Sequence, residues 1–228
     1  MRRSPRGSLL QLCAAGLALL AAPAGSRGGD RSPAEALAVA RRVQARYEQT
    51  ADLAAEFSQE MRLAAGGQVI RSHGRMFFAK PGRMRWEYQA PEPQTIVADG
   101  ETLWVYQPED RQVLRAPLRR AFQSDTPVSF LLGVARLERD FEPSLLDGAP
   151  AGVLRLRLEP RAEEGSLGTL VLEVDAETYD IRAATIRDPL GNTTRVALRQ
   201  VRRNAGVDPA LFRFERPPGV DVIQAPAS

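Results

Sequence analysis

The chain has 228 residues, 43% of them hydrophobic and 26% charged, a composition typical of a globular protein rather than a disordered or fibrous one. The formal net charge of +3 comes entirely from Arg2, Arg3 and Arg6, so the rest of the chain is balanced and nucleic-acid binding is not expected. One cysteine and one histidine exclude a cysteine–histidine metal site, and we expect neither a metal nor a cofactor.

The first 24 residues have the layout of a secretory signal peptide. Three arginines precede an apolar run that ends at Ala22-Pro23-Ala24, which is a small-residue cleavage site. The run is shorter than the roughly 20 residues that a membrane span needs. We therefore predict that residues 1–24 are cleaved on export and that residues 25–228 form one domain.

Cys13 is the residue that could change this interpretation, because a cysteine that closes a signal peptide can be lipidated. It follows Leu12 instead of a small residue, and it lies early in the apolar run. We expect it to be removed with the signal peptide. The mature chain then has no cysteine, and its stability must come from burial rather than from disulfides.

A helix of about 16 residues is predicted to open the domain. Ser32 is a suitable N-cap and Pro33 suits the first helical position. One apolar stripe follows at helical spacing, formed by Ala36, Ala40, Val43 and Tyr47. The arginines at positions 41, 42 and 46 are expected to form the solvated face.

From residue 52 onward, apolar and polar residues alternate with the period of half-buried β-strands. The pattern predicts strands over 53–63, 69–79, 84–88, 103–106, 112–114, 154–159, 170–174, 181–187 and 194–201, with a further one around Ile96. A second short helix is expected after Thr126-Pro127, ending at Gly133. The outer faces carry arginine and glutamate and are expected to be solvated.

The area of this sheet bears on function. Roughly ten strands give an apolar face of about 1,000 Å², and the first helix covers about a quarter of it. The sheet can fold on itself as a sandwich or barrel, or it can stay curved beneath helices and enclose an apolar cavity. The alternation alone leaves both arrangements open.

Catalytic machinery is missing from the pattern. His73 is the only histidine, it lies at a turn-like start of a strand, and no G-x-S-x-G motif is present. We interpret His73 as a surface or structural residue. We therefore expect no catalytic residues and no enzyme activity.

A series of motifs in the strands resembles the LolA family of periplasmic outer-membrane lipoprotein carriers. The motifs are Phe57-x-Gln59, the segment 80–88 (KPGRMRWEY), the segment 103–108 (LWVYQP), Leu131-Leu132-Gly133 and the segment 218–223 (PGVDVI). Each motif alone is common, and it is their order and spacing that make the resemblance specific.

The resemblance implies a mainly β (α+β) fold: one curved antiparallel sheet that forms an unclosed β-barrel, covered by the N-terminal helix and a short helical lid. It implies a monomeric periplasmic carrier that takes acylated lipoproteins from a LolCDE-like ABC transporter in the inner membrane to a LolB-like acceptor in the outer membrane. The alternatives are a membrane-anchored LolB-like acceptor, a lipid-sensing regulator of similar fold and, with least support, a hydrolase.

The combined pattern also predicts the cargo site. We expect acyl chains to lie on one apolar face built by Leu53, Phe57, Met61, Met76, Phe78, Met84 and Trp86, beneath Phe130 and Leu131 of the lid. Family members often carry an arginine before the proline of the second-strand turn, and it donates to lid carbonyls. Here the residue is Lys80, the only lysine in the chain, which can donate as a point charge. It is either the latch of the lid or a solvated turn residue.

Overall fold

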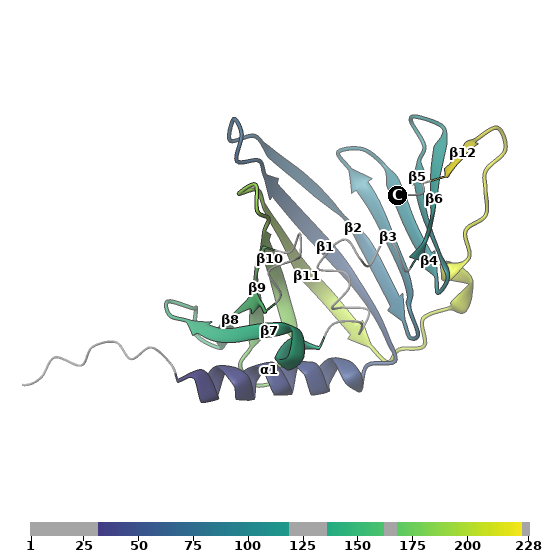
Figure 1. Ribbon diagram of the computed structural model, residues 1–228. Helices are drawn as coiled ribbons and strands as arrows, with labels where there is room; N and C mark the ends of the chain where they lie inside the picture. Colours follow the sequence, from purple (N-terminus) through teal and green to yellow (C-terminus); the bar gives the residue numbers. More distant parts are fainter. Residues whose placement is uncertain (1–31, 119–135, 162–167, 225–228) are drawn as a thin grey trace, which may run out of the picture.

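The computed structural model of the protein describes residues 32–118, 136–161 and 168–224 (Figure 1). A helix, α1 (Pro33–Glu48), precedes a long series of strands. The first half contains β1 (Asp52–Arg62), β2 (Val69–Ala79), β3 (Arg83–Ala90), β4 (Gln94–Asp99), β5 (Thr102–Gln107) and β6 (Gln112–Pro117). The second half contains α4 (Leu137–Asp140), β7 (Phe141–Leu146), β8 (Val153–Pro160), β9 (Thr169–Asp175), β10 (Ile181–Arg187), β11 (Thr193–Arg203), the 3₁₀ helix η1 (Pro209–Phe212) and β12 (Asp221–Gln224).

The described strands form one sheet of twelve, in the order β12-β6-β5-β4-β3-β2-β1-β11-β10-β9-β8-β7. Neighbouring strands are antiparallel except β12, which runs parallel to β6. The sheet bends but does not close, since its two edge strands, β7 and β12, do not pair with each other. Helix α1 lies across one end of the strands (Figure 1). The predicted mainly β, unclosed fold is therefore confirmed.

Helix α1 begins as its sequence predicts. The Ser32 hydroxyl accepts a hydrogen bond from the Glu35 amide at 3.2 Å and so caps the first turn. The predicted stripe is buried, with Val39 added to it, and packs into the same core as both halves of the sheet. No helix within the described ranges is long and apolar enough to cross a membrane.

The arginine face of α1 does more than meet solvent, which the sequence did not indicate. Arg41 is ion-paired with Glu138 of α4, and Arg46 Nε donates to Asp180 at 3.0 Å. Arg42 lies over the Tyr179 ring and donates to its hydroxyl. These contacts fix α1 against α4 and against the turn that joins β9 to β10.

The convex face also differs from the expectation of a solvated surface. Four buried apolar residues lie outside the main core cluster: Val97 on β4, Val113 on β6, and Phe212 and Val220 from the chain after β11. Trp104 joins this side, where its ring stacks on that of Phe214 at a centroid distance of 5.3 Å. The chain after β11 forms this cover by returning across the back of the sheet before β12 pairs with β6.

Candidate functional site

Register brings most of the predicted cargo residues together on the concave face. Leu53 pairs with Phe78, which pairs with Met84, so three neighbouring strands form a first apolar row near α1. The next row contains Met76 and Trp86, opposite each other on β2 and β3. Because strand side chains alternate between faces, both rows point to the same side of the sheet.

The seven predicted side chains are not equally placed. Six of them are buried in the main core cluster: Leu53, Phe57, Met76, Phe78, Met84 and Trp86. Met61 lies further along β1, is only half-buried and is outside that cluster. The predicted lid residues Phe130 and Leu131, like the predicted signal peptide and Cys13, lie outside the described residues.

Aromatic rings form the centre of this face. Trp86 meets Phe57 edge-to-face at a centroid distance of 4.7 Å, and Phe78 at 6.2 Å. Tyr88 stacks with Trp86 at 6.1 Å and meets Phe57 at 4.9 Å. Such rings offer a broad apolar wall.

A glycine makes room for this arrangement. Gly74 lies between Phe57 on β1 and Tyr88 on β3. A Cβ atom at this position would stand 1.8 Å from the Glu87 carbonyl oxygen and 3.0 Å from the Phe57 ring. Only glycine therefore lets Phe57 and the β3 backbone approach β2 so closely.

The concave face becomes more polar along the strands. Beyond the row of Trp86, the apolar side chains of Phe57, Met61 and Ile70 share the inward positions with four polar ones, Gln59, Ser72, Tyr88 and Gln94. The Tyr88 hydroxyl donates to Gln59 Oε1 at 3.1 Å, and burial raises the pKa of Tyr88 to about 12. These four side chains border a pocket of about 370 Å³ at the end of the sheet away from α1.

Near the β12 edge of the sheet the same face becomes exposed. Leu114 on β6 lies beside Ile223 on β12, and the two are 38% and 45% exposed. Leu114 pairs with Val105, which continues the row of Trp86 across β4 and β5. The apolar surface therefore runs from the buried centre to the edge of the sheet.

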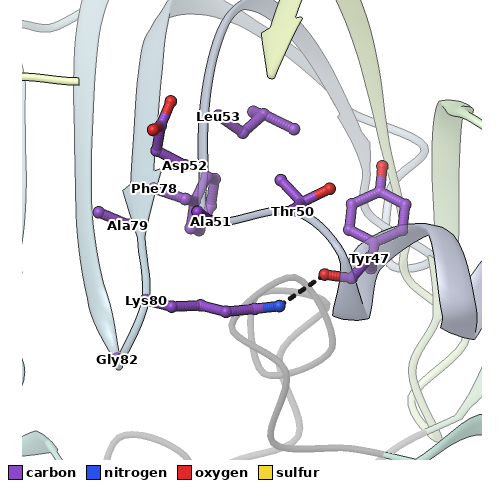
Figure 2. A pocket seen from close by; sticks show the side chains of 9 residues that line it. All are labelled: Tyr47, Thr50, Ala51, Asp52, Leu53, Phe78, Ala79, Lys80 and Gly82. Carbon is purple, nitrogen blue, oxygen red and sulfur yellow. Dashed lines mark hydrogen bonds between the residues drawn. The ribbon is translucent and has the colours of Figure 1, made fainter. Parts of the chain in front are cut away.

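Lys80 is placed by the turn between β2 and β3, where Gly82 has a positive φ of 62°. Its Nζ donates to the carbonyl oxygen of Tyr47 at 2.7 Å (Figure 2). It also donates to the carbonyl oxygen of Glu48 at 2.8 Å, and these two are the last residues of α1. A cation at a helix C-terminus also interacts favourably with the helix dipole. The structure thus joins Lys80 to α1, a partner that the sequence did not identify.

Other candidate chemistry is not assembled. His73 is exposed on β2, and its side chain lies on the convex face because it alternates with Gly74. Among the described residues, no group of three or more histidine, cysteine, aspartate or glutamate side chains could hold a metal ion. The site is therefore an apolar concave surface, and beside it the charged Lys80 side chain is hydrogen-bonded to the end of α1.

Comparisons with known proteins identify the family of the chain. Residues 48–215 match the family model of the outer membrane lipoprotein carrier protein LolA. An outer-membrane lipoprotein carrier protein of Chromobacterium violaceum is 33% identical over 196 residues, which cover 86% of this chain and 91% of that protein. One from Halorhodospira halophila is 39% identical over 161 residues, covering 70% of this chain and 73% of that protein.

A solved structure supports the fold alone. An uncharacterized conserved protein of Thermus thermophilus superposes with a TM-score of 0.53 at 14% identity, covering 84% of this chain and 99% of that one. The family model spans most of the sheet together with Lys80 and the concave rows. The chain therefore belongs to the LolA family of outer membrane lipoprotein carrier proteins.

Proposed function

We propose that the protein is a soluble periplasmic carrier that binds the acyl chains of lipoproteins and delivers them to an acceptor at the outer membrane. The observation that carries the proposal is the continuous apolar concave face of an unclosed sheet, centred on Trp86 and Phe57. The names of the curated relatives, which are outer-membrane lipoprotein carrier proteins, point to the same cargo.

Physical chemistry explains why such a cargo needs a carrier. Each methylene buried from water contributes roughly 0.8 kcal/mol, so a protein with several acyl chains cannot leave a membrane unshielded at a useful rate. The apolar concave face of the carrier takes the place of the bilayer interior while the lipoprotein crosses the periplasm. The carrier must hold the chains less tightly than the final acceptor does, since delivery would otherwise stop.

Binding requires a conformational change. The six clustered side chains are buried in this structure, so they must become accessible before an acyl chain can contact them. The contacts of Lys80 with the end of α1 favour the closed arrangement. We propose that opening separates α1 and the lid from the sheet, and that Lys80 helps to restore closure and expel cargo.

The partners follow from the two ends of the route. We propose that an ABC transporter of the LolCDE type loads the carrier at the inner membrane and that a LolB-like acceptor unloads it. The predicted signal peptide would bring the chain to the periplasm, where it would act as a monomer. No step in this cycle needs a cofactor or a catalytic residue.

Mass spectrometry of the protein purified from periplasm tests the proposal. We expect lipoprotein or its acylated N-terminal peptide to accompany the wild-type protein in sub-stoichiometric amounts. Recovery of phospholipid alone would favour a lipid-sensing regulator. An acylated N-terminus on the carrier itself would favour a membrane-anchored acceptor.

A further inference from the structure

The buried indole of Trp86 has an unused hydrogen-bond donor. The side chain is only 5% exposed, and its Nε1 atom is buried without a hydrogen-bond partner among the residues that the structure describes. Most buried donors in proteins are paired, because leaving one unpaired is unfavourable. An unpaired donor on a ligand-binding wall indicates that the ligand provides the acceptor.

The neighbours of Trp86 explain why the donor stays unpaired. The rings packed around it are those of Phe57, Phe78 and Tyr88. The two phenylalanines have no acceptor, and the Tyr88 hydroxyl donates to Gln59 and makes no hydrogen bond with Trp86. The side chains opposite Trp86 on the adjoining strands, Met76 and Ile96, are apolar.

Trp86 also lies at the boundary between the two kinds of surface. On its α1 side the row consists of Leu53, Phe78, Met84 and Ala98, which is entirely apolar. On its other side the next row keeps the apolar Phe57 but adds Gln94 and the hydroxyl of Tyr88, and both of these polar residues border the pocket of about 370 Å³. A bound acyl chain whose tail pointed toward α1 would place its first polar atoms beside Trp86.

We propose that the indole N–H of Trp86 donates a hydrogen bond to a carbonyl oxygen of an ester- or amide-linked acyl chain. This assignment rests on the proposed carrier function and adds the polar anchor that sets how deeply the chain enters. An indole nitrogen can only donate, so its partner must be an acceptor. A neutral carbonyl suits the apolar surroundings, whereas a free carboxylate or phosphate would lose its hydration without a compensating cation.

The test compares an ester, a carboxylate and an alkane of similar chain length. Methyl laurate, laurate and an alkane with as many heavy atoms as the ester compete for the purified protein against the fluorescent probe bis-ANS. We expect Trp86→Phe, which keeps an aromatic ring but no donor, to weaken ester binding about five- to tenfold, the size of one net hydrogen bond. Alkane binding should change less than about twofold, because the apolar area is nearly retained.

Trp104→Phe is the matched control. It is the same substitution on the convex face, where Trp104 packs against Phe214 and its own Nε1 lies 3.5 Å from Asp99. It should leave the ester-to-alkane preference unchanged. The variant also leaves Trp86 as the only tryptophan, so a ¹H–¹⁵N spectrum shows a single indole signal.

That signal gives a second readout that does not depend on the folding of Trp86→Phe. On addition of methyl laurate the indole proton should move downfield, as expected on forming a hydrogen bond, and the alkane should cause a smaller or opposite shift. Equal shifts with ester and alkane would overturn the proposal. An unchanged ester preference in a folded Trp86→Phe variant would also overturn it.

Lipoproteins and phospholipids both contain acyl carbonyls, so two further ligands separate these sources. A synthetic triacylated lipopeptide and phosphatidylglycerol vesicles are each titrated against wild type and Trp86→Phe.

Weaker binding of the lipopeptide by the variant supports the assignment, whether or not phospholipid binding also weakens. Weaker binding of phospholipid alone overturns the assignment to lipoproteins. If the lipopeptide binds both proteins equally, the anchor is refuted while the carrier function stands. If no acylated ligand binds wild type, both are refuted.

Discussion

The contact between Lys80 and α1 allows a quantitative prediction. One ammonium group donates to two carbonyl oxygens at 2.7 and 2.8 Å, and no other lysine can take its place. Hydrogen bonds from charged donors contribute about 1.5–3 kcal/mol, and Lys80 is exposed, so we take about 1.5 kcal/mol for the pair. Lys80→Leu should therefore shift the balance from closed to open roughly tenfold.

The consequence for the cycle is asymmetric. In the proposed cycle, opening is needed to accept cargo and closure is needed to expel it, so Lys80→Leu should still load and should deliver poorly. Lys80→Arg should deliver at least as well as wild type, because a guanidinium can bridge both carbonyl oxygens. The assay follows loaded carrier and delivered lipoprotein separately, with purified acceptor in membranes.

Because the chain has a single lysine, a direct measurement of the contact is available. Amine-selective acetylation followed by peptide mass spectrometry reports the accessibility of Lys80 separately from the N-terminal amine. We expect slow labelling of the empty wild-type protein and faster labelling after cargo loading. Equal delivery by Lys80→Leu and wild type would refute the latch and leave Lys80 as a solvated turn residue. The same conclusion would follow if the acetylation rate of Lys80 did not change on cargo loading.

Three other expectations concern the wall, the sheet and the N-terminus. Met84→Asp should abolish acyl binding while the protein still shows cooperative unfolding. A variant that does not fold would show that Met84 belongs to a core that stays closed rather than to a binding surface. Gly74→Ala should lower the free energy of unfolding by about 2–4 kcal/mol, because its Cβ would meet the Glu87 carbonyl oxygen. Chemical denaturation measures this loss, and a smaller loss would show that β3 can move away from β2. Intact-mass measurement should place the mature N-terminus near Gly25, whereas a diacylglycerol on Cys13 would move the protein to the acceptor class.

The fold could be predicted from the sequence where a local pattern determines it. Ser32 and Pro33 specify the start of α1, and the alternation over 53–63, 69–79 and 84–88 identifies the side chains that share the concave face. Two strands were missed. β7 contains Pro143 and alternates poorly, and β12 has four residues that pair with a strand more than a hundred residues away.

Alternation shows which residues share a face but not what covers that face. Val97 and Trp104 alternate in the same way as residues of a solvated surface, and they are covered only because the chain returns after β11. The partner of Lys80 was hidden for a similar reason, because α1 lies more than thirty residues earlier. The shared face of Gln59, Ser72, Tyr88 and Gln94, which lie in two neighbouring rows, appears only when the register of four strands is known.

An unclosed sheet has two free margins, and unpaired backbone groups at such margins can recruit strands from other molecules. Here each margin is a poor template. β12 offers only four residues, and β7 carries Pro143, which has no N–H to donate, and lies against α1 and α4. In the proposed cycle the chain can therefore expose its apolar face on opening without offering neighbouring molecules a long strand edge on which to aggregate.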